Sequence, residues 1–185
     1  MVKTDFKKNK GFTLVELMVS ISLFSIVMLI SMGSIMTVLD SNRKSQSLRA
    51  VMDNLNFTLE SMTRSIRFGE KYHCGTSGTL TNPSDCPSGD TSLTLLAPLP
   101  SGTTGLVTYR LSAGKIVKTV GGVDMDLTSL DVTIDRLTFY VLGSASSDTY
   151  QPRVLIVVKG HSGTKTSTQT SFTLETTISQ RKFDY

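Results

Sequence analysis

Residues 10–16 read Lys-Gly-Phe-Thr-Leu-Val-Glu, and they open a long apolar run. From Phe12 to Leu39 the chain has 28 residues with a single ionisable side chain, Glu16. As a helix rising 1.5 Å per residue, this run is about 42 Å long, more than the roughly 30 Å hydrocarbon core of a bilayer. A single span in lipid must satisfy its backbone hydrogen bonds internally, which only a helix does. The run therefore predicts a transmembrane helix over residues 12–39.

The charges around this run are distributed unevenly. A carboxylate inside a membrane-length helix is unfavourable by a few kcal/mol, so a residue such as Glu16 generally has a partner and a function. The first eleven residues hold four lysines and one aspartate, and they contribute +3 of the formal charge of +4. By the positive-inside rule, residues 1–11 lie in the cytoplasm and the chain after Leu39 lies outside. The remaining +1 is not the basic footprint of a nucleic-acid-binding protein.

Lys10-Gly11-Phe12 followed by Glu16 resembles the class III signal of type IV prepilins and type II secretion pseudopilins. The resemblance implies that a leader, residues 1–11, is cleaved between Gly11 and Phe12. Phe12 then becomes an N-methylated N-terminus, and Glu16 docks against a neighbouring subunit during assembly. Implied partners are other pilins or pseudopilins, a prepilin peptidase, the inner-membrane assembly platform and the membrane. The implied location is the inner (cytoplasmic) membrane, crossed once, and then a pilus or pseudopilus.

The helical pattern continues beyond the apolar run in amphipathic form, over residues 40–68. No proline occurs before Pro83, so one helix from about Thr13 to Phe68 is allowed, with Gly69 as its stop signal. Apolar residues at spacings of three and four predict that this second half packs on a folded head. The predicted stripe consists of Leu48, Met52, Leu55, Leu59, Met62 and Ile66.

Residues 69–90 are rich in glycine, serine, threonine and proline, and predict a loop around the only two cysteines. Cys74 and Cys86 both follow the membrane run, in the part expected outside the cytoplasm. Pairing there would close a short loop and stabilise the fold by about 2–3 kcal/mol in the chain-entropy model. We expect a disulfide; the alternatives are free thiols, or a metal site with the adjacent His73, which would need further ligands.

Residues 91–185 predict a β-sheet head, because β-branched residues are prominent and many segments alternate in polarity. Hairpin turns are expected at residues 112–114 and 161–164, and a polar loop at residues 143–150. The predicted strands are Thr91–Ala97, Leu106–Leu111, Lys115–Val120, a short one at residues 132–134, Leu137–Leu142, Arg153–Lys159 and Ser171–Ile178.

Catalytic motifs are absent from the sequence. The two histidines, His73 and His161, have no triad context, and no phosphate-binding loop or paired metal-ligand motif occurs. We therefore expect no enzyme activity, no cofactor and no metal. Aspartates at positions 124, 126, 131 and 135 offer oxygen ligands for Ca²⁺, but they alternate with apolar residues as solvated strand edges and turns do.

Three segments near the C-terminus indicate which subclasses of this family the chain resembles. Residues 137–141, 151–154 and 172–181 look like the C-terminal half of W-type minor pilins and J-type minor pseudopilins. This implies an α+β fold, the pilin α/β-roll, in which a long N-terminal helix packs on an antiparallel sheet. It also implies a low-copy subunit that primes or tips the filament.

Two other functions stay open from the sequence. A signal-anchored extracytoplasmic binding domain would keep residues 1–11 and never polymerise. A DNA-uptake pilin would carry a basic patch on its head, whereas the basic residues within 69–185 are scattered along the sequence.

Overall fold

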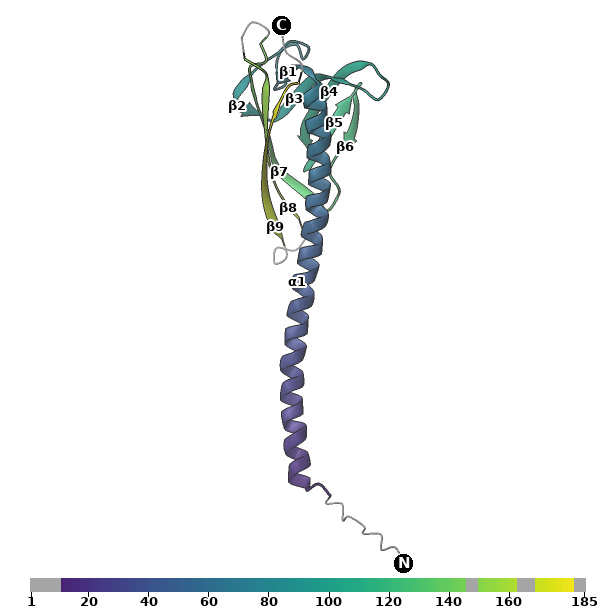
Figure 1. Cartoon of the computed structure of the whole chain (residues 1–185), viewed down its shortest axis with the longest axis vertical. Coiled ribbons are helices and arrows are strands. Elements are labelled where there is room, and N and C mark those ends of the chain that lie inside the picture. The colour runs from purple at the N-terminus through teal and green to yellow at the C-terminus, as the bar shows by residue number, and fades with distance from the viewer. Residues whose placement is uncertain (1–10, 146–149, 163–168, 182–185) are drawn as a thin grey trace, which may run out of the picture. The chain divides into compact units, whose positions relative to one another are not determined.

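The structure, a computed structural model, describes residues 11–145, 150–162 and 169–181. The chain divides into two compact units, one ending at Ser45 and the other comprising Gln46–Tyr185. Leader residues 1–10 lie outside the described residues. Helix α1 (Leu14–Phe68) begins in the first unit and ends in the second, which we call the head (Figure 1). The predicted helix is therefore present with its expected ends.

The first unit consists of the beginning of α1. Its large apolar side chains from Phe12 to Leu39 are 46–82% exposed, and none of its described residues is buried. This stretch makes α1 long and apolar enough to cross a membrane. The helix continues through Gly33 without a break.

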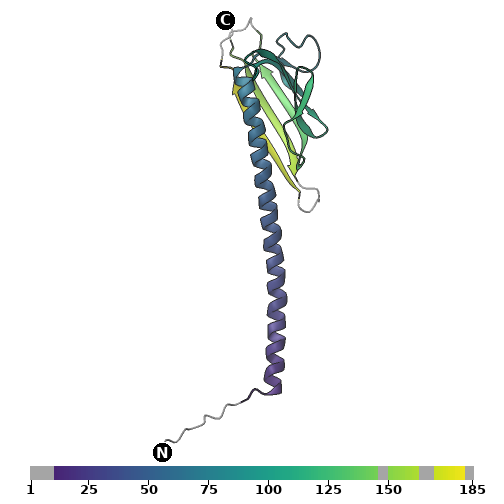
Figure 2. The ribbon, with the colours of Figure 1, turned by 90° about the vertical axis from the view of Figure 1, so that its right-hand side faces the viewer.

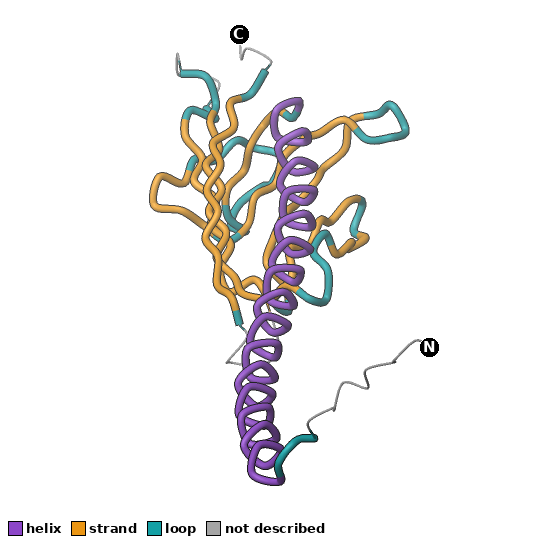
Figure 3. Tube along the Cα trace, turned by 60° about the horizontal axis from the view of Figure 1, so that its bottom comes forward, coloured by secondary structure: helices purple, strands orange, loops and turns teal. Residues whose placement is uncertain are grey.

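Within the head, the C-terminal part of α1 buries one stripe against the sheets. The stripe is formed by Val51, Leu55, Thr58, Met62 and Ile66, which follow one another at spacings of three and four. The predicted stripe is therefore only partly correct. Leu55, Met62 and Ile66 are buried, whereas Leu48, Met52 and Leu59 are only half-buried. Strands lie on either side of this part of the helix (Figure 3), and the turned view places the helix along one side of the head (Figure 2).

Two antiparallel sheets form the rest of the head. The five-stranded sheet has the order β1-β3-β4-β5-β6, and the four-stranded sheet has the order β2-β7-β8-β9. Most of both sheets consists of long strands that are rich in β-branched and aromatic residues, as their sequences predict. The strands are β1 (Glu70–Cys74), β2 (Cys86–Asp90), β3 (Ser92–Pro98), β4 (Thr104–Ser112), β5 (Lys115–Val120), β6 (Val123–Asp126), β7 (Val132–Leu142), β8 (Arg153–Ser162) and β9 (Thr170–Ser179).

One apolar core joins the helix stripe to the inner faces of both sheets. Tyr109 on β4 and Phe139 on β7 are among its largest fully buried side chains. Burial raises the pKa of Tyr109 to about 12, and the nearby Ser65 hydroxyl opposes this shift. Among the described residues, however, the phenol oxygen has no partner at hydrogen-bond geometry, so desolvation dominates. The expected α+β architecture, which is consistent with the pilin fold, is confirmed.

The prediction that residues 69–90 are only a loop is wrong. Strand β1 pairs with β3, and β2 pairs with β7, so two short strands flank a connection at residues 75–85. Both strands are polar and both pairings contain an irregularity, which explains why their sequences carry little alternation. Gly69 ends the helix as expected, and a Cβ there would lie 2.3 Å from a methyl carbon of Leu95.

The strand predictions need three further corrections. Strand β6 was missed, because its Val-Asp-Met-Asp sequence is fully exposed and pairs through a turn at Gly121-Gly122, where both φ angles are positive. Residues 132–134 belong to the same strand as Leu137–Leu142, with a bulge between them. His161 and Ser162 continue β8 instead of turning, whereas residues 163 and 164 lie outside the described part. The turn at residues 112–114 is confirmed.

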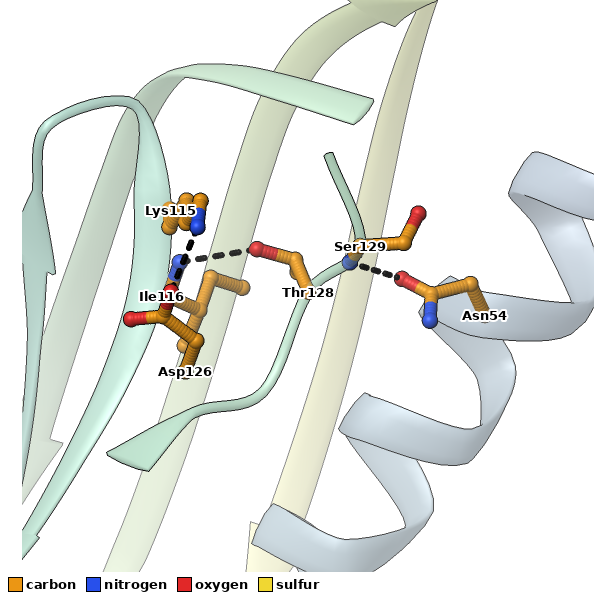
Figure 4. Close-up of polar contacts among 6 residues, drawn as sticks. All are labelled: Asn54, Lys115, Ile116, Asp126, Thr128 and Ser129. Atoms are coloured by element: carbon orange, nitrogen blue, oxygen red, sulfur yellow. Dashed lines mark hydrogen bonds and ion pairs between the residues drawn. The ribbon is translucent and has the colours of Figure 1, made fainter. Parts of the chain in front are cut away.

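Polar contacts hold the segment after β6 to the helix and to β5 (Figure 4). The backbone N–H of Ser129 donates to Asn54 Oδ1 at 3.1 Å, and the N–H of Ile116 donates to Thr128 Oγ1 at 3.2 Å. The fully buried Thr58 hydroxyl lies 2.9 Å from the carbonyl oxygen of Leu127. Because buried polar groups are destabilising when unpaired, these contacts fix where the segment sits on α1.

We expect Thr58→Val to lower the free energy of unfolding of the head by about 1–2 kcal/mol. The single Thr58 hydroxyl proton serves the Leu127 and Asn54 carbonyls, each 2.9 Å away; valine keeps the shape of the side chain but removes this donor. Thermal denaturation of the full chain in detergent measures the effect, with Asn56→Ala, an exposed change on the same helix, as control. A melting temperature equal to that of the control would contradict the assigned role.

Candidate processing and assembly site

The start of α1 holds two of the sequence-predicted site residues. Phe12 is 82% exposed two residues before the helix begins at Leu14, and Glu16 lies in the first turn. The Thr13 side chain caps the helix, because its Oγ1 accepts a hydrogen bond from the Glu16 N–H at 3.3 Å. Thr13-Leu14-Val15-Glu16 therefore has the sequence of a capping box, in which a glutamate three residues after the cap supports the first turn. Sequence reasoning missed the Thr13 cap, although the spacing indicates it.

Gly11 is not required by packing in this chain. A Cβ built on it meets no atom within 4 Å. A bulkier residue at position 11 is therefore compatible with the structure, and any requirement for glycine comes from another protein that recognises it.

Four hydroxyl groups within the apolar part of α1 are satisfied by the helix itself. Ser20, Ser22 and Ser25 each donate to the carbonyl four residues earlier, at 2.8–2.9 Å. Thr37 does the same to Gly33 at 3.1 Å. Such bonds make these hydroxyls tolerable in lipid, because each donor is paired. The charged group that remains in this stretch is the Glu16 carboxylate.

Cys74 and Cys86 form a disulfide, with their Cα atoms 5.8 Å apart. Cys74 ends β1 and Cys86 begins β2, and each of these strands lies at the edge of its sheet. The bond therefore joins the edges of the two sheets, as well as closing the segment between the cysteines.

The segment between the cysteines is ordered by more than the disulfide. Ser84 pairs with β1 through backbone bonds to Tyr72 and Cys74, at 2.9 and 3.0 Å. The buried His73 ring lies between two backbone carbonyls, with Nδ1 2.7 Å from the Asn82 oxygen and Nε2 2.8 Å from the Ser77 oxygen. Carbonyl oxygens only accept hydrogen bonds, so a neutral imidazole satisfies one of them and an imidazolium satisfies both. His73 thus supports the loop from inside.

Three of the four aspartates that were considered as calcium ligands have separate side-chain partners. Asp124 forms an ion pair with Arg110 and Asp126 with Lys115, and Asp135 Oδ2 lies 3.0 Å from His161 Nδ1. No three His, Cys, Asp or Glu side chains of the described residues come together as a metal site.

A comparison with known protein families finds a match in the N-terminal segment. Residues 6–32 match the family described as the prokaryotic N-terminal methylation motif. The chain carries a prepilin signal of the type IV pilin and pseudopilin class. No similar curated protein and no similar solved structure was found. The prepilin signal implies processing by a prepilin peptidase and assembly with other pilins in a membrane. Together with the long apolar helix α1, this signal fits a membrane-anchored protein.

We expect removal of the disulfide, by Cys74→Ser together with Cys86→Ser, to lower the stability of the head by about 2–3 kcal/mol without unfolding it. The remaining core, the Ser84 pairing and His73 keep the two sheets in place. Thermal denaturation of the full chain in detergent measures this loss, and wild-type protein treated with reductant should melt with the double variant. Equal melting of oxidised wild type and variant would show that the bond contributes nothing.

Proposed function

We propose that this protein is a minor pilin or minor pseudopilin, a subunit that enters a type IV pilus or a type II secretion pseudopilus and primes or tips it. The observation that carries the proposal is the prepilin signal leading directly into one membrane-length helix, with Glu16 in the first turn. The processed chain begins at Phe12, N-methylated, after cleavage between Gly11 and Phe12.

Glu16 is the assembly residue in this proposal. Cleavage creates a positively charged amine at Phe12, and the amine of a neighbouring subunit meets Glu16 among packed helices. An isolated charge of either sign is strongly unfavourable in such surroundings, whereas a hydrogen-bonded pair offsets much of the desolvation. Because only one longitudinal offset between two helices brings the groups together, the pair sets the register of the subunits.

The head supports the choice of a minor subunit. The three segments that resemble W-type minor pilins and J-type minor pseudopilins fall on β7, β8 and β9 or directly beside them. These strands are neighbours in one sheet, so the resemblance concerns one continuous part of the fold.

The remaining parts of the proposal concern location and partners. The leader faces the cytoplasm, α1 crosses the inner membrane once, and the head lies outside until the subunit enters the filament. A prepilin peptidase and the inner-membrane assembly platform act on it. The role is structural instead of catalytic; both histidines serve structural contacts, His73 in the cysteine loop and His161 with Asp135.

For processing, we expect Gly11→Leu to leave residues 1–11 attached, whereas wild-type protein starts at a methylated Phe12. A Cβ at position 11 meets no atom of the described residues within 4 Å, so we expect a failure of cleavage to reflect recognition by the peptidase. Intact-mass measurement of the membrane-extracted proteins distinguishes the two forms, with Asn9→Ala as a leader control. A wild-type chain that retains residue 1 would support the signal-anchored domain and contradict the proposal.

For assembly, we expect Glu16→Gln and Glu16→Ala to insert into the membrane and to lose co-purification with partner pilins equally. Glutamine can replace glutamate in a capping box but has no charge for a neighbour's amine. Glu60→Gln, on an exposed part of the same helix, is the matched control and should behave as wild type. If Glu16→Gln assembles normally and only Glu16→Ala fails, the residue acts as a helix cap and the charge-pair role is wrong.

A further inference from the structure

The outer face of β7, β8 and β9 has an unusual composition for a solvent-facing sheet. Residues paired across antiparallel strands point to the same face, and the face opposite the core is normally polar. Here apolar side chains from β7 and β8 occupy its middle beside two threonines and a glutamate, and three basic residues lie at its margins (Figure 1 labels the strands). The rows on this face are Leu142-Arg153-Ser179, Tyr140-Leu155-Thr177, Thr138-Val157-Glu175 and Arg136-Lys159-Thr173.

The apolar centre of this face is accessible. Leu142 is 44% exposed, and Tyr140, Leu155 and Val157 are half-buried by their neighbours in the sheet. A hollow of about 370 Å³, large enough to accept an apolar side chain, is lined by Tyr140, Leu142 and Leu155 together with Pro87, Arg153 and Thr177. Such a surface is stabilised when a partner covers it.

Arg153 stands at the edge of this centre and lines three adjoining hollows. Tyr150, which is 72% exposed, lines two of them. The described residues provide no ion-pair partner for the Arg153 guanidinium. Arginine and tyrosine beside an apolar pocket are the residues that most often dominate binding energy at protein interfaces.

The charge of this face favours an acidic partner. Arg136, Arg153 and Lys159 oppose a single carboxylate on the face, Glu175. Asp85 lies at the rim near Arg153, but its carboxylate already accepts hydrogen bonds from the Gly143 and Ser144 backbone and from the Ser144 hydroxyl. Within the described residues the Arg153 guanidinium has no ion-pair partner, so its fork can bond bidentately to a partner carboxylate.

We propose that this face binds an acidic segment of a partner protein, which places a carboxylate on Arg153 and an apolar side chain in the hollow over Leu155. The inference concerns the head and does not depend on filament assembly through Glu16. A protein is favoured over a nucleic acid because the centre of the face is aliphatic, whereas nucleic acids are held mainly by phosphate contacts to basic residues.

The test uses the purified full chain in detergent and a fluorescent five-residue peptide with one leucine between two pairs of glutamates. We expect this peptide to bind at least about tenfold more tightly than its glutamine counterpart, since a hydrogen bond to a charged group has that effect or more. Arg153→Glu should remove most of the difference, and Arg153→Lys should give an intermediate affinity. Because Arg153 is exposed, we expect neither substitution to affect folding, and an unchanged melting temperature verifies this.

The matched control is Arg64→Glu, which makes the same charge change at an arginine on α1 whose side chain is 75% exposed. It should leave peptide binding unchanged. Four results would overturn the proposal: no binding of the acidic peptide, equal binding of the glutamine peptide, equal loss in both arginine variants, or displacement of the peptide by a short DNA duplex in an Arg153-dependent way. The last result would assign the face to nucleic acid.

Discussion

The apolar surface at the beginning of α1 is the constraint on which the rest of the molecule depends. Its large side chains are exposed in the single chain, and in water that surface would be strongly unfavourable. Lipid or neighbouring helices must cover it. The helix satisfies its own backbone, and several of its hydroxyls bond to the preceding turn. Glu16 is then the group for which lipid offers no partner, which is why a second subunit is the natural place to look for one.

The same helix changes its environment within the head. From Val51 onward, one stripe of α1 is buried and the opposite side is mostly polar apart from the exposed Phe57, so this part packs on the core of a water-facing domain. The stripe is not purely apolar. Thr58 is buried with it, and together with Asn54 it holds the segment between β6 and β7. The disulfide between Cys74 and Cys86 provides a second fixed point, at the edges of the two sheets.

Much of this fold could be predicted from the sequence. The helix ends were predictable because the long apolar run, the absence of proline and Gly69 each give a strong signal. The long strands were predictable because their β-branched residues alternate or run continuously. Strands β1, β2 and β6 were not, because they are short and polar, and tertiary pairing stabilises them instead of local propensity. The outer face of β7, β8 and β9 around Arg153 was also not predictable, because residues that are neighbours across strands are distant in the sequence.

The central claim is that a neighbouring subunit covers the start of α1 near Glu16. Site-specific photocrosslinking tests it directly. A photoreactive amino acid at position 17, beside Glu16, is activated in intact cells that carry the complete assembly machinery, and the crosslinked peptides are identified by mass spectrometry. The account predicts crosslinks to the N-terminal segment of another pilin, beginning at its processed residue. Crosslinks to lipid alone, in cells that assemble filaments, would contradict it.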